Sequence, residues 1–345
     1  MKALLLRLKQ RLPAVLLALA LLPGAGPAYS QTKVKFVLDW TWQAPHAIWT
    51  LAQDNGHFAK EGLDVTIDRG FGSGDTIAKV AAKTYEFGFA DGNILIKFNS
   101  EQPADQLITA LIVLDASPNS VIFMKSSGIK IPKDLEGKSA STTKNDGTNV
   151  MFPVFARLTG INPDTIKWQH VEPRLRDTLV IRGQADITLG WATTSVMNMM
   201  AAGVERDKIG YLLFHDYGMQ LFSSGVMVRK DYAAANPEVV KGFVRATIKG
   251  MQDLVANPKA GIVSLMKRDK LLNFNIELLR YELIRDIGLL TPHVAKSGVS
   301  TVERERYERA AALVAEAFNL KVNPKMEDTY TDRFLPPQSE RMLKR

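Results

Sequence analysis

The sequence predicts an α/β fold built from two lobes. Short apolar runs rich in β-branched residues alternate with segments of helical periodicity, a pattern typical of parallel sheets covered by helices. The chain has 345 residues, 46% of them apolar, which is enough for about two domains with a sizeable core. Polar, glycine-bearing loops at 70–75 and 144–149 each precede a helix, so the two halves of the chain share a plan.

The expected elements follow in order along the chain. In the first half, strands are expected at 34–38, 63–67, 87–90 and 107–114, with helices at 47–53 and 76–82. In the second half, strands are expected at 139–142, 165–171, 185–190 and 211–214, with helices at 150–160 and 175–183. Ser73 or Asp75 can cap the helix at 76–82. From Asp231 onward the chain is predicted to be helical, and we expect these helices to pack on the first lobe and to carry little chemistry.

Residues 1–30 have the three parts of a secretory signal peptide. Four basic residues precede an apolar run at 14–22, and Ala28 and Ser30 place small side chains before a cleavage point at Gln31. The apolar run is too short for a stable membrane anchor, although an uncleaved anchor is the alternative. We therefore expect a secreted, periplasmic chain without a lipid anchor, and no other run is long enough to span a membrane.

Composition excludes several classes of function. The chain has no cysteine, which rules out disulfides, thiol nucleophiles and thiolate metal sites. Removal of the four basic residues of the leader lowers the formal net charge from +8 to +4, too little to indicate nucleic acid as a partner. The five histidines show no metal-ligand spacing, so no metal site is predicted.

The most informative stretch runs from Val34 to His57. A short apolar strand ends at Leu38, and Asp39, Trp40, Trp42 and His46 follow before the next helix. These side chains therefore lie at the carboxyl end of a strand, the edge where open α/β sheets bind ligands. Trp40 and Trp42, with Trp191 at a later strand end, fit a stacking pocket, although packing in the core is the plainer reading.

Val34 to Ile67 resembles the opening of the periplasmic solute-binding proteins of ABC importers. The resemblance rests on the strand followed by Asp39-Trp40, on Pro45-His46, and on Gln53-Asp-Asn-Gly-His-Phe-Ala-Lys-Glu-Gly-Leu-Asp-Val65. Within these proteins, the stretch most resembles the group that binds nitrate, sulfonates, taurine and thiamine pyrimidine precursors. The resemblance implies the type II periplasmic binding protein fold, with two hinge-crossing strands and a ligand cleft between the lobes.

The resemblance also implies where the lobes divide. Residues 31–124 and 225–345 would form lobe 1, and residues 125–224 would form lobe 2. The strand at 120–125 would begin the crossing to the second lobe, and the strand at 222–229 would return to the first.

Further candidate ligand-binding residues lie in both lobes. In the first lobe they are Ser73 and Gly74, on a glycine loop that opens a helix, and Asp91 and Asn93, which the resemblance places at the pocket floor. In the second lobe they are Asn145, Thr148, Glu172 and Trp191.

The function implied is capture of a small organic solute and its delivery to an ABC permease driven by a separate ATPase. Such a receptor needs no cofactor, and we expect a monomer. Asp39-Trp40 and Pro45-His46 favour a thiamine-precursor pyrimidine or another aromatic heterocycle. That branch usually has a glutamate after the tryptophan equivalent to Trp191, whereas Ala192 to Ser195 follow here, so nitrate, a sulfonate, taurine or an aromatic carboxylate remains the alternative.

A third possibility is an enzyme of the same fold. The fungal pyrimidine synthase that consumes its own pyridoxal cofactor shares this opening and carries a cofactor lysine, a sacrificial histidine and a cysteine cluster. Here residues 88–94 contain neither lysine nor histidine, and residues 220–225 contain no cysteine. We therefore expect a binding protein rather than an enzyme.

Overall fold

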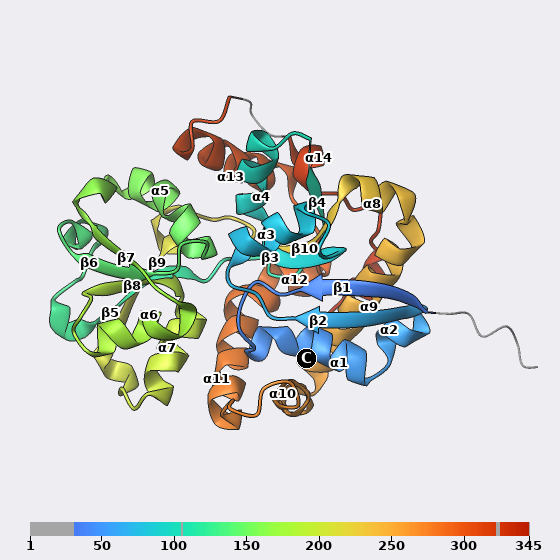
Figure 1. Cartoon of the computed structure of the whole chain (residues 1–345), viewed down its shortest axis with the longest axis horizontal. Helices are drawn as coiled ribbons and strands as arrows, with labels where there is room; N and C mark the ends of the chain where they lie inside the picture. Colours follow the sequence, from blue (N-terminus) through green and yellow to red (C-terminus); the bar gives the residue numbers. More distant parts are fainter. Residues whose placement is uncertain (1–30, 105, 322–324, 345) are drawn as a thin grey trace, which may run out of the picture. The chain divides into compact units, whose positions relative to one another are not determined.

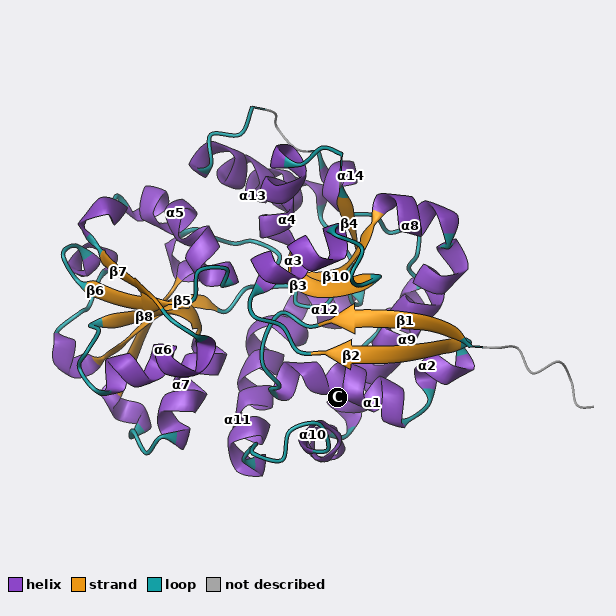
Figure 2. Ribbon diagram, viewed as in Figure 1, coloured by secondary structure: helices purple, strands orange, loops and turns teal. Residues whose placement is uncertain are grey.

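Two five-stranded β-sheets, each flanked by helices, organise the structure (Figures 1 and 2). The structure is a computed structural model that describes residues 31–104, 106–321 and 325–344. The predicted signal peptide at 1–30 lies outside the described residues. The α/β prediction with two lobes is confirmed.

The first sheet has the strand order β2-β1-β3-β10-β4. Its strands are β1 (Thr32–Val37), β2 (Leu63–Asp68), β3 (Phe87–Asp91), β4 (Leu107–Ile112) and β10 (Ser224–Arg229). β1 runs parallel to β2 and β3, whereas β10 is antiparallel to β3 and β4. β3 is buried along its whole length, which fits its position in the middle of the sheet.

The second sheet repeats this plan with the order β7-β6-β8-β5-β9. Its strands are β5 (Asn119–Met124), β6 (Ser139–Thr142), β7 (Lys167–His170), β8 (Ile187–Trp191) and β9 (Ile209–Leu213). β6 is parallel to β7 and β8, and β5 is antiparallel to β8 and β9. In each sheet the antiparallel strand is the first strand after a crossing between the lobes.

The first crossing comes earlier than the sequence analysis placed it. β5 pairs with β8 and β9, so residues 119–124 belong to the second sheet and not to lobe 1. The chain crosses between Ile112 and Asn119, and it returns through residues 218–223 before β10. The crossings are thus irregular segments beside the strands, because each strand is taken up by the sheet that it has reached.

The helices cover the sheets on both sides (Figure 1). The first lobe contains α1 (Ala47–Asp54), α2 (His57–Lys60), α3 (Ser73–Ala81) and α4 (Gly92–Glu101), and the second contains α5 (Gly147–Thr159), α6 (Pro173–Ile181) and α7 (Ala192–Ala201). The remaining helices are α8 (Lys230–Ala235), α9 (Pro237–Ala256), α10 (Pro258–Met266), α11 (Phe274–Ile284), α12 (Pro292–Ser297), α13 (Arg304–Ala317) and α14 (Met326–Thr329), with a π-turn, η7 (Arg285–Leu289). Short 3₁₀ turns are η1 (Ala44–His46), η2 (Lys125–Ser127), η3 (Pro132–Leu135), η4 (Pro163–Thr165), η5 (Arg206–Lys208), η6 (Phe214–Tyr217) and η8 (Gln338–Arg341).

Two helices, one in each lobe, begin three residues earlier than expected. α5 begins at Gly147 because Asp146 caps it, accepting hydrogen bonds from the backbone N–H groups of Thr148 and Asn149. α3 begins at Ser73, and its N-cap is Gly72, which has no capping side chain. The prediction that Ser73 or Asp75 caps α3 is therefore wrong.

The C-terminal helices are not confined to the first lobe. α11 packs against α10 of the first lobe and α7 of the second, and α13 packs against both α4 and α5. The expectation that these helices lie on the first lobe alone is therefore wrong. No helix among the described residues is both long and apolar enough to cross a membrane.

Candidate functional site

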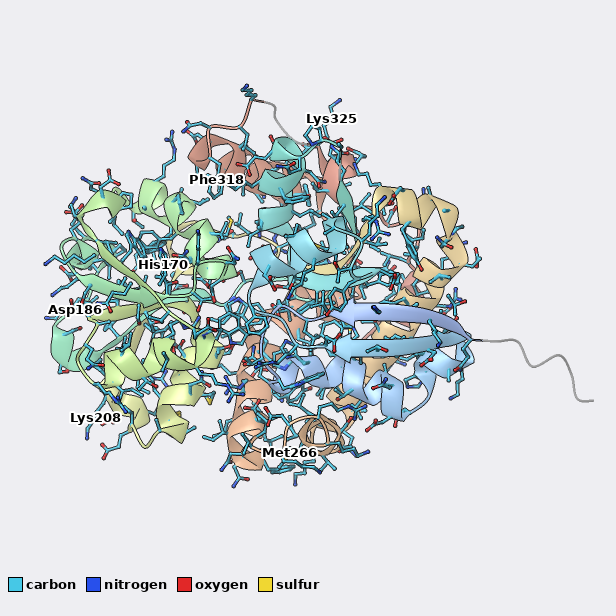
Figure 3. All side chains as sticks on the ribbon, in the orientation of Figure 1. His170, Asp186, Lys208, Met266, Phe318 and Lys325 are labelled. Atoms are coloured by element: carbon cyan, nitrogen blue, oxygen red, sulfur yellow. The ribbon has the colours of Figure 1, made fainter. Side chains whose placement is uncertain are left out.

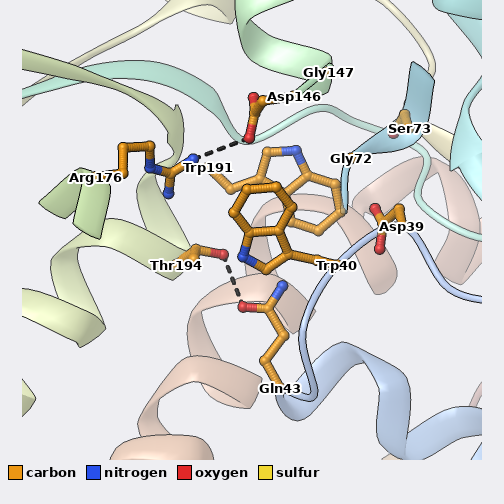
Figure 4. A pocket seen from close by; sticks show the side chains of 10 residues that line it. All are labelled: Asp39, Trp40, Gln43, Gly72, Ser73, Asp146, Gly147, Arg176, Trp191 and Thr194. Atoms are coloured by element: carbon orange, nitrogen blue, oxygen red, sulfur yellow. Dashed lines mark hydrogen bonds and ion pairs between the residues drawn. The ribbon is translucent and has the colours of Figure 1, made fainter. Parts of the chain in front are cut away.

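A pocket lies between the two lobes (Figure 4). Loops at the carboxyl ends of β1 and β2 supply its first-lobe wall, and the ends of β6 and β8 with helices α6 and α7 supply the other. Its lining consists of Asp39, Trp40, Gln43, Gly72, Ser73, Asp146, Gly147, Arg176, Trp191 and Thr194. The pocket is therefore at the sheet edges where the sequence analysis expected a ligand.

Asp39 presents a carboxylate to this pocket from the loop after β1. Its Oδ1 atom lies 3.1 Å from Nε2 of His46, whose Nδ1 accepts a hydrogen bond from the backbone N–H of Gln43 at 3.3 Å. These two contacts fix the neutral tautomer of His46 with the proton on Nε2. The second oxygen, Oδ2, accepts no hydrogen bond from any described residue, so it is available to a solute.

Two tryptophan rings enter the same pocket from opposite lobes. Trp40 follows Asp39 and is 8% exposed, and Trp191 ends β8 and is half-buried. Figure 4 shows both rings at the centre of the pocket, between Arg176 and Asp146 on one side and Asp39 on the other. Aromatic faces placed in this way can hold a flat solute.

Arg176 is the one cation in the lining, and its charge is already balanced. Its guanidinium donates to Asp146 Oδ2 at 2.9 Å, to Asp177 Oδ1 at 3.3 Å and to Ser195 Oγ at 2.9 Å. The group is 1% exposed, lies against Gly190, and faces the Trp40 ring at 5.1 Å. Burial raises the pKa of the Asp146 carboxyl, while the charge of Arg176 opposes that rise.

The two lobes touch at the rim of the pocket. The backbone N–H of Gly74 donates to the carbonyl of Asn145 at 3.2 Å. At Gly72, φ is +124°, and a Cβ there would lie 2.3 Å from the same carbonyl oxygen. Only glycine fits this position, because both the backbone conformation and the opposing lobe exclude a side chain.

A larger groove adjoins the pocket and shares Trp40, Gln43 and Thr194 with it. A hydrogen bond from Thr194 Oγ1 to Gln43 Oε1, 2.9 Å long, spans the two lobes at this shared wall. Trp42 lines this outer groove and not the inner pocket. The groove has room for a substituent of a ring held inside.

Four of the twelve residues singled out in the sequence line the inner pocket: Asp39, Trp40, Ser73 and Trp191. Of the others, His46 lies behind Asp39, and Gly74 and Asn145 meet at the rim. Asp91 and Asn93 are buried and bonded to each other, Thr148 is buried and donates to Asn119, Glu172 is exposed, and Trp42 lines the outer groove. The structure therefore brings the first-lobe loop together as expected, and replaces most of the second-lobe candidates.

The lining residues that the sequence analysis missed are Gln43, Gly72, Asp146, Gly147, Arg176 and Thr194. Asp146 had a usable signal, because an aspartate directly before a helix is a preferred cap and its position at the helix start points it toward the cleft. Thr194 belongs to the hydroxyl-rich stretch after Trp191 but was not selected. Arg176 had no such signal in the sequence, since a cation within a helix normally lies in solvent.

No group of three or more His, Asp or Glu side chains among the described residues is arranged to hold a metal ion. His46 is buried beneath the pocket and His57 pairs with Asp253. His170 is exposed at the end of β7 on the second lobe (Figure 3).

Relatives with curated names cover most of the chain at low identity. The chain is 23% identical to a 4-amino-5-hydroxymethyl-2-methylpyrimidine phosphate synthase of Legionella pneumophila, over 89% of this chain and 93% of the relative. It is 24% identical to a formylaminopyrimidine-binding protein of Halalkalibacterium halodurans, over 70% and 72% of the two chains. It is 28% identical to a taurine-binding periplasmic protein of Escherichia coli, over 60% and 63%.

Solved structures share the fold. The alkanesulfonate-binding protein SsuA of Xanthomonas axonopodis pv. citri matches with a TM-score of 0.67 at 13% identity, over 87% of this chain and 98% of that chain. The periplasmic nitrate-binding protein NrtA of Synechocystis matches with a TM-score of 0.66 at 13% identity, over 88% and 87%. The family model described as NMT1/THI5 like matches residues 43–261. The chain therefore belongs to the NMT1/THI5-like family and has the two-lobed fold of periplasmic binding proteins.

Proposed function

We propose that this protein is the periplasmic receptor of an ABC importer and that its solute is a planar heterocycle with amino groups, of the aminopyrimidine kind. The free Oδ2 atom of Asp39, in a pocket that also contains the rings of Trp40 and Trp191, is the observation that carries this proposal. A carboxylate oxygen accepts hydrogen bonds from ring amino groups, and the tryptophans offer faces for the ring. Asp39 would thereby supply the carboxylate that residues 192–195 lack.

The charges of the lining favour this class over nitrate, sulfonates and taurine. Asp39 and Asp146 outnumber the single cation, Arg176, and that cation already donates to two carboxylates. An anionic solute in the inner pocket would meet the Asp39 carboxylate, and the one cation of that lining is already bonded to carboxylates, so binding would cost free energy in a site of low dielectric. A neutral or cationic ring avoids this cost.

The connection between the two cavities also suits a ring with a substituent. The inner pocket and the outer groove share the wall formed by Trp40, Gln43 and Thr194. A side group could pass Gln43 and Thr194 into the outer groove. Capture would bring the lobes together by hinge motion, and the closed receptor would dock on a membrane permease served by a separate ATPase.

The second candidate is a pyrimidine synthase, because relatives of similar length carry that name. A pyridoxal cofactor is held in such enzymes through an imine with a lysine. No lysine lines the inner pocket or the outer groove among the described residues, and this absence from the walls favours the receptor.

A thermal-shift screen tests the proposal. Residues 31–345 would be unfolded and refolded to remove carried-over solute, then mixed with aminopyrimidines, flavins, taurine, alkanesulfonates, nitrate and aromatic acids. A solute that binds only the native state at 100 times its Kd adds about 2.7 kcal/mol of stability. We expect a rise in Tm with the aminopyrimidines, confirmed by calorimetry, and none with nitrate or the sulfonates.

Asp39→Asn is the matched variant for this screen. The amide keeps the size of the carboxylate but loses its charge and one acceptor, so affinity for an aminopyrimidine should fall by about 10- to 100-fold. A response to sulfonates that rises in Asp39→Asn while wild-type protein ignores aminopyrimidines would overturn the proposed ligand class.

A further inference from the structure

Helix α11 connects the two lobes behind the pocket. Tyr281 and Ile284 belong to the buried apolar cluster of the first lobe, whereas Ile276 and Leu283 pack against the cluster of the second. Figure 1 shows α11 at the boundary between the lobes. Although α11 packs apolar side chains against both lobes, two of its charged residues, Glu277 and Arg280, are buried as well.

Glu277 bonds to the first-lobe loop that lines the pocket. Its Oε2 atom accepts a hydrogen bond from the backbone N–H of Ala44 at 2.7 Å, and its side chain is 3% exposed. Ala44 directly follows Gln43, a lining residue. The carboxylate therefore fixes the backbone from which the Gln43 side chain reaches across the cleft.

Arg280 bonds to the second lobe at the matching position. Its Nη1 atom donates to the carbonyl oxygens of Thr193 and Thr194, both at 3.0 Å, and Nη2 donates to Asn198 Oδ1 at 3.0 Å. Its Nε atom donates to both carboxylate oxygens of Glu277, at 3.0 and 3.1 Å. Glu277 and Arg280 therefore form a continuous set of hydrogen bonds from the first-lobe loop to the first two turns of α7.

The two residues at the ends of this connection meet in the pocket wall. Gln43 and Thr194 bond to each other across the cleft at 2.9 Å, and the pair on α11 bonds to the backbone N–H of Ala44, next to Gln43, and to the backbone carbonyl of Thr194. Two charged groups that are each about 4% exposed or less are costly to desolvate, and removal of one partner leaves the other charge buried and uncompensated. Here the two groups bond to segments of both lobes at once.

We propose that Glu277 and Arg280 form an interlobe strut that positions Gln43 and Thr194 and stabilises the closed state of the receptor. The strut would be complete only when the lobes are together, because its bonds to Thr193, Thr194 and Asn198 end in the second lobe. Loss of the strut shifts the population toward the open state and weakens solute retention by the same factor. The inference deepens the proposed receptor function and rests on it only for the consequence for solute binding.

The first measurement needs no solute. Cysteines introduced at the exposed positions Lys60 and Lys208, one in each lobe, are spin-labelled in a chain that has no cysteine of its own, and the distance distribution between the labels is recorded. Arg280→Met should increase the fraction of long distances relative to the wild-type background. Lys270→Met removes an exposed cation near the same helix and should leave the distribution unchanged.

Two further variants keep the test decisive if Arg280→Met unfolds. Arg280→Lys keeps the positive charge but lacks the planar fork that reaches Thr193, Thr194 and Asn198 together, and Glu277→Gln keeps the shape but removes the charge of the partner. Each should widen the distribution in a protein that still melts cooperatively. Distributions identical to wild type in these folded variants would overturn the strut.

The second measurement separates the strut from the ligand class. With 4-amino-5-hydroxymethyl-2-methylpyrimidine as probe, Arg280→Lys should bind at least tenfold more weakly than wild type, mainly through faster dissociation. If wild type ignores this probe but the label distances still widen in the variants, the proposed ligand class fails and the strut stands. If wild type binds the probe and the distances do not change, the strut fails alone.

Discussion

Trp40 belongs to the first lobe, yet its ring faces Arg176 of the second at 5.1 Å. The ring therefore has two roles: it offers a face to the pocket, and it covers a buried guanidinium. An aromatic ring stacked on a cation or on a heterocycle contributes about 1 to 3 kcal/mol per contact. Trp40 also lies at the wall that the inner pocket and the outer groove share.

Trp40→Ala should weaken binding of the solute identified in the screen by about 1 to 3 kcal/mol, because both the stacking face and the buried area are lost. Trp40→Phe retains a ring of smaller area, so it should lose less. Isothermal titration calorimetry on the three proteins measures the difference. Unchanged affinity in Trp40→Ala would refute stacking by this residue.

Asp91 is a buried carboxylate whose protonation is coupled to folding. It caps α4, and its Oδ1 atom accepts from the backbone and side-chain nitrogens of Asn93 at 2.8 and 2.7 Å. Burial raises the pKa of Asp91 from 3.8 to about 6, and the nearby charge of Asp39 adds to the rise against the opposing bonds from Asn93. The folded state therefore binds this proton more tightly than the unfolded state does.

The stability that depends on Asp91 should be present below about pH 4 and fall as the pH rises to about 6. Between these values the folded chain holds more protons than the unfolded chain, so raising the pH favours unfolding by up to about 3 kcal/mol in total. Asn caps helices as well as Asp, so Asp91→Asn should remove this slope without loss of the cap. Urea unfolding of both proteins from pH 4 to pH 7 isolates the difference, and parallel curves would contradict the assignment.

At the scale of elements, α13 contacts both crossings between the lobes. Arg306 Nη1 donates to Asp115 Oδ1 at 2.8 Å in the first crossing, and its guanidinium lies 3.9 Å from the ring of Phe222 in the return crossing. Asp115 is held further by Thr291 Oγ1 at 2.6 Å and by a bond from its backbone N–H to the carbonyl of Gly288 at 2.8 Å. The hinge is thus braced by residues nearly two hundred positions later in the chain.

Arg306→Met should lower the free energy of unfolding by about 2 to 4 kcal/mol, because it leaves the mostly buried Asp115 carboxylate without its cation. Hydrogen exchange should also speed up at residues 113–118 and 218–223, since both crossings lose a contact. Arg309→Met, on the exposed face of the same helix, is the control and should change stability by less than about 0.5 kcal/mol. Equal effects of the two variants would show that α13 does not brace the hinge.

The elements were largely predictable from the sequence, because apolar period and turn residues are local properties. β1 was expected at 34–38 and lies at Thr32–Val37, and α6 was expected at 175–183 and lies at Pro173–Ile181. The assignment of β5 to the second sheet was not predictable, because its run of apolar residues fits either sheet. Partner choice depends on where the irregular crossing at 113–118 places the strand.

The residues of the site also divide into those that local sequence predicts and those that depend on tertiary contacts. Asp39 and Trp40 directly follow a strand, so chain order alone places them at the ligand edge. Arg176 is one turn into a helix, and its burial depends on its neighbour Asp177 and on an aspartate, a serine and a glycine brought together from three other segments. Tertiary partners of this kind leave no periodic trace in the sequence, and the same holds for Glu277 and Arg280.

At the scale of the whole molecule, the two lobes have one strand order and close on each other with equivalent loops. The loop before α3 and the loop before α5 meet at the rim, where Gly74 donates to the carbonyl of Asn145. Opening the cleft must break this contact together with the bond between Thr194 and Gln43. Contact between these loops is therefore a direct measure of closure.

The double variant Gly74→Cys, Asn145→Cys should lock the receptor closed. A Cβ at position 74 lies 3.5 Å from Cβ of Asn145, within the range of disulfides, and the absence of native cysteines makes this the one disulfide that can form within a chain. The bond closes a loop of about 70 residues and should add about 4 kcal/mol to the stability of the oxidised form. Solute loaded before oxidation should be retained, and solute added afterwards should not enter until the bond is reduced. Free exchange of solute in protein whose disulfide is verified by mass spectrometry would mean that solute reaches the pocket without separation of these loops. Either single-cysteine variant serves as the control, because it cannot form the internal bond.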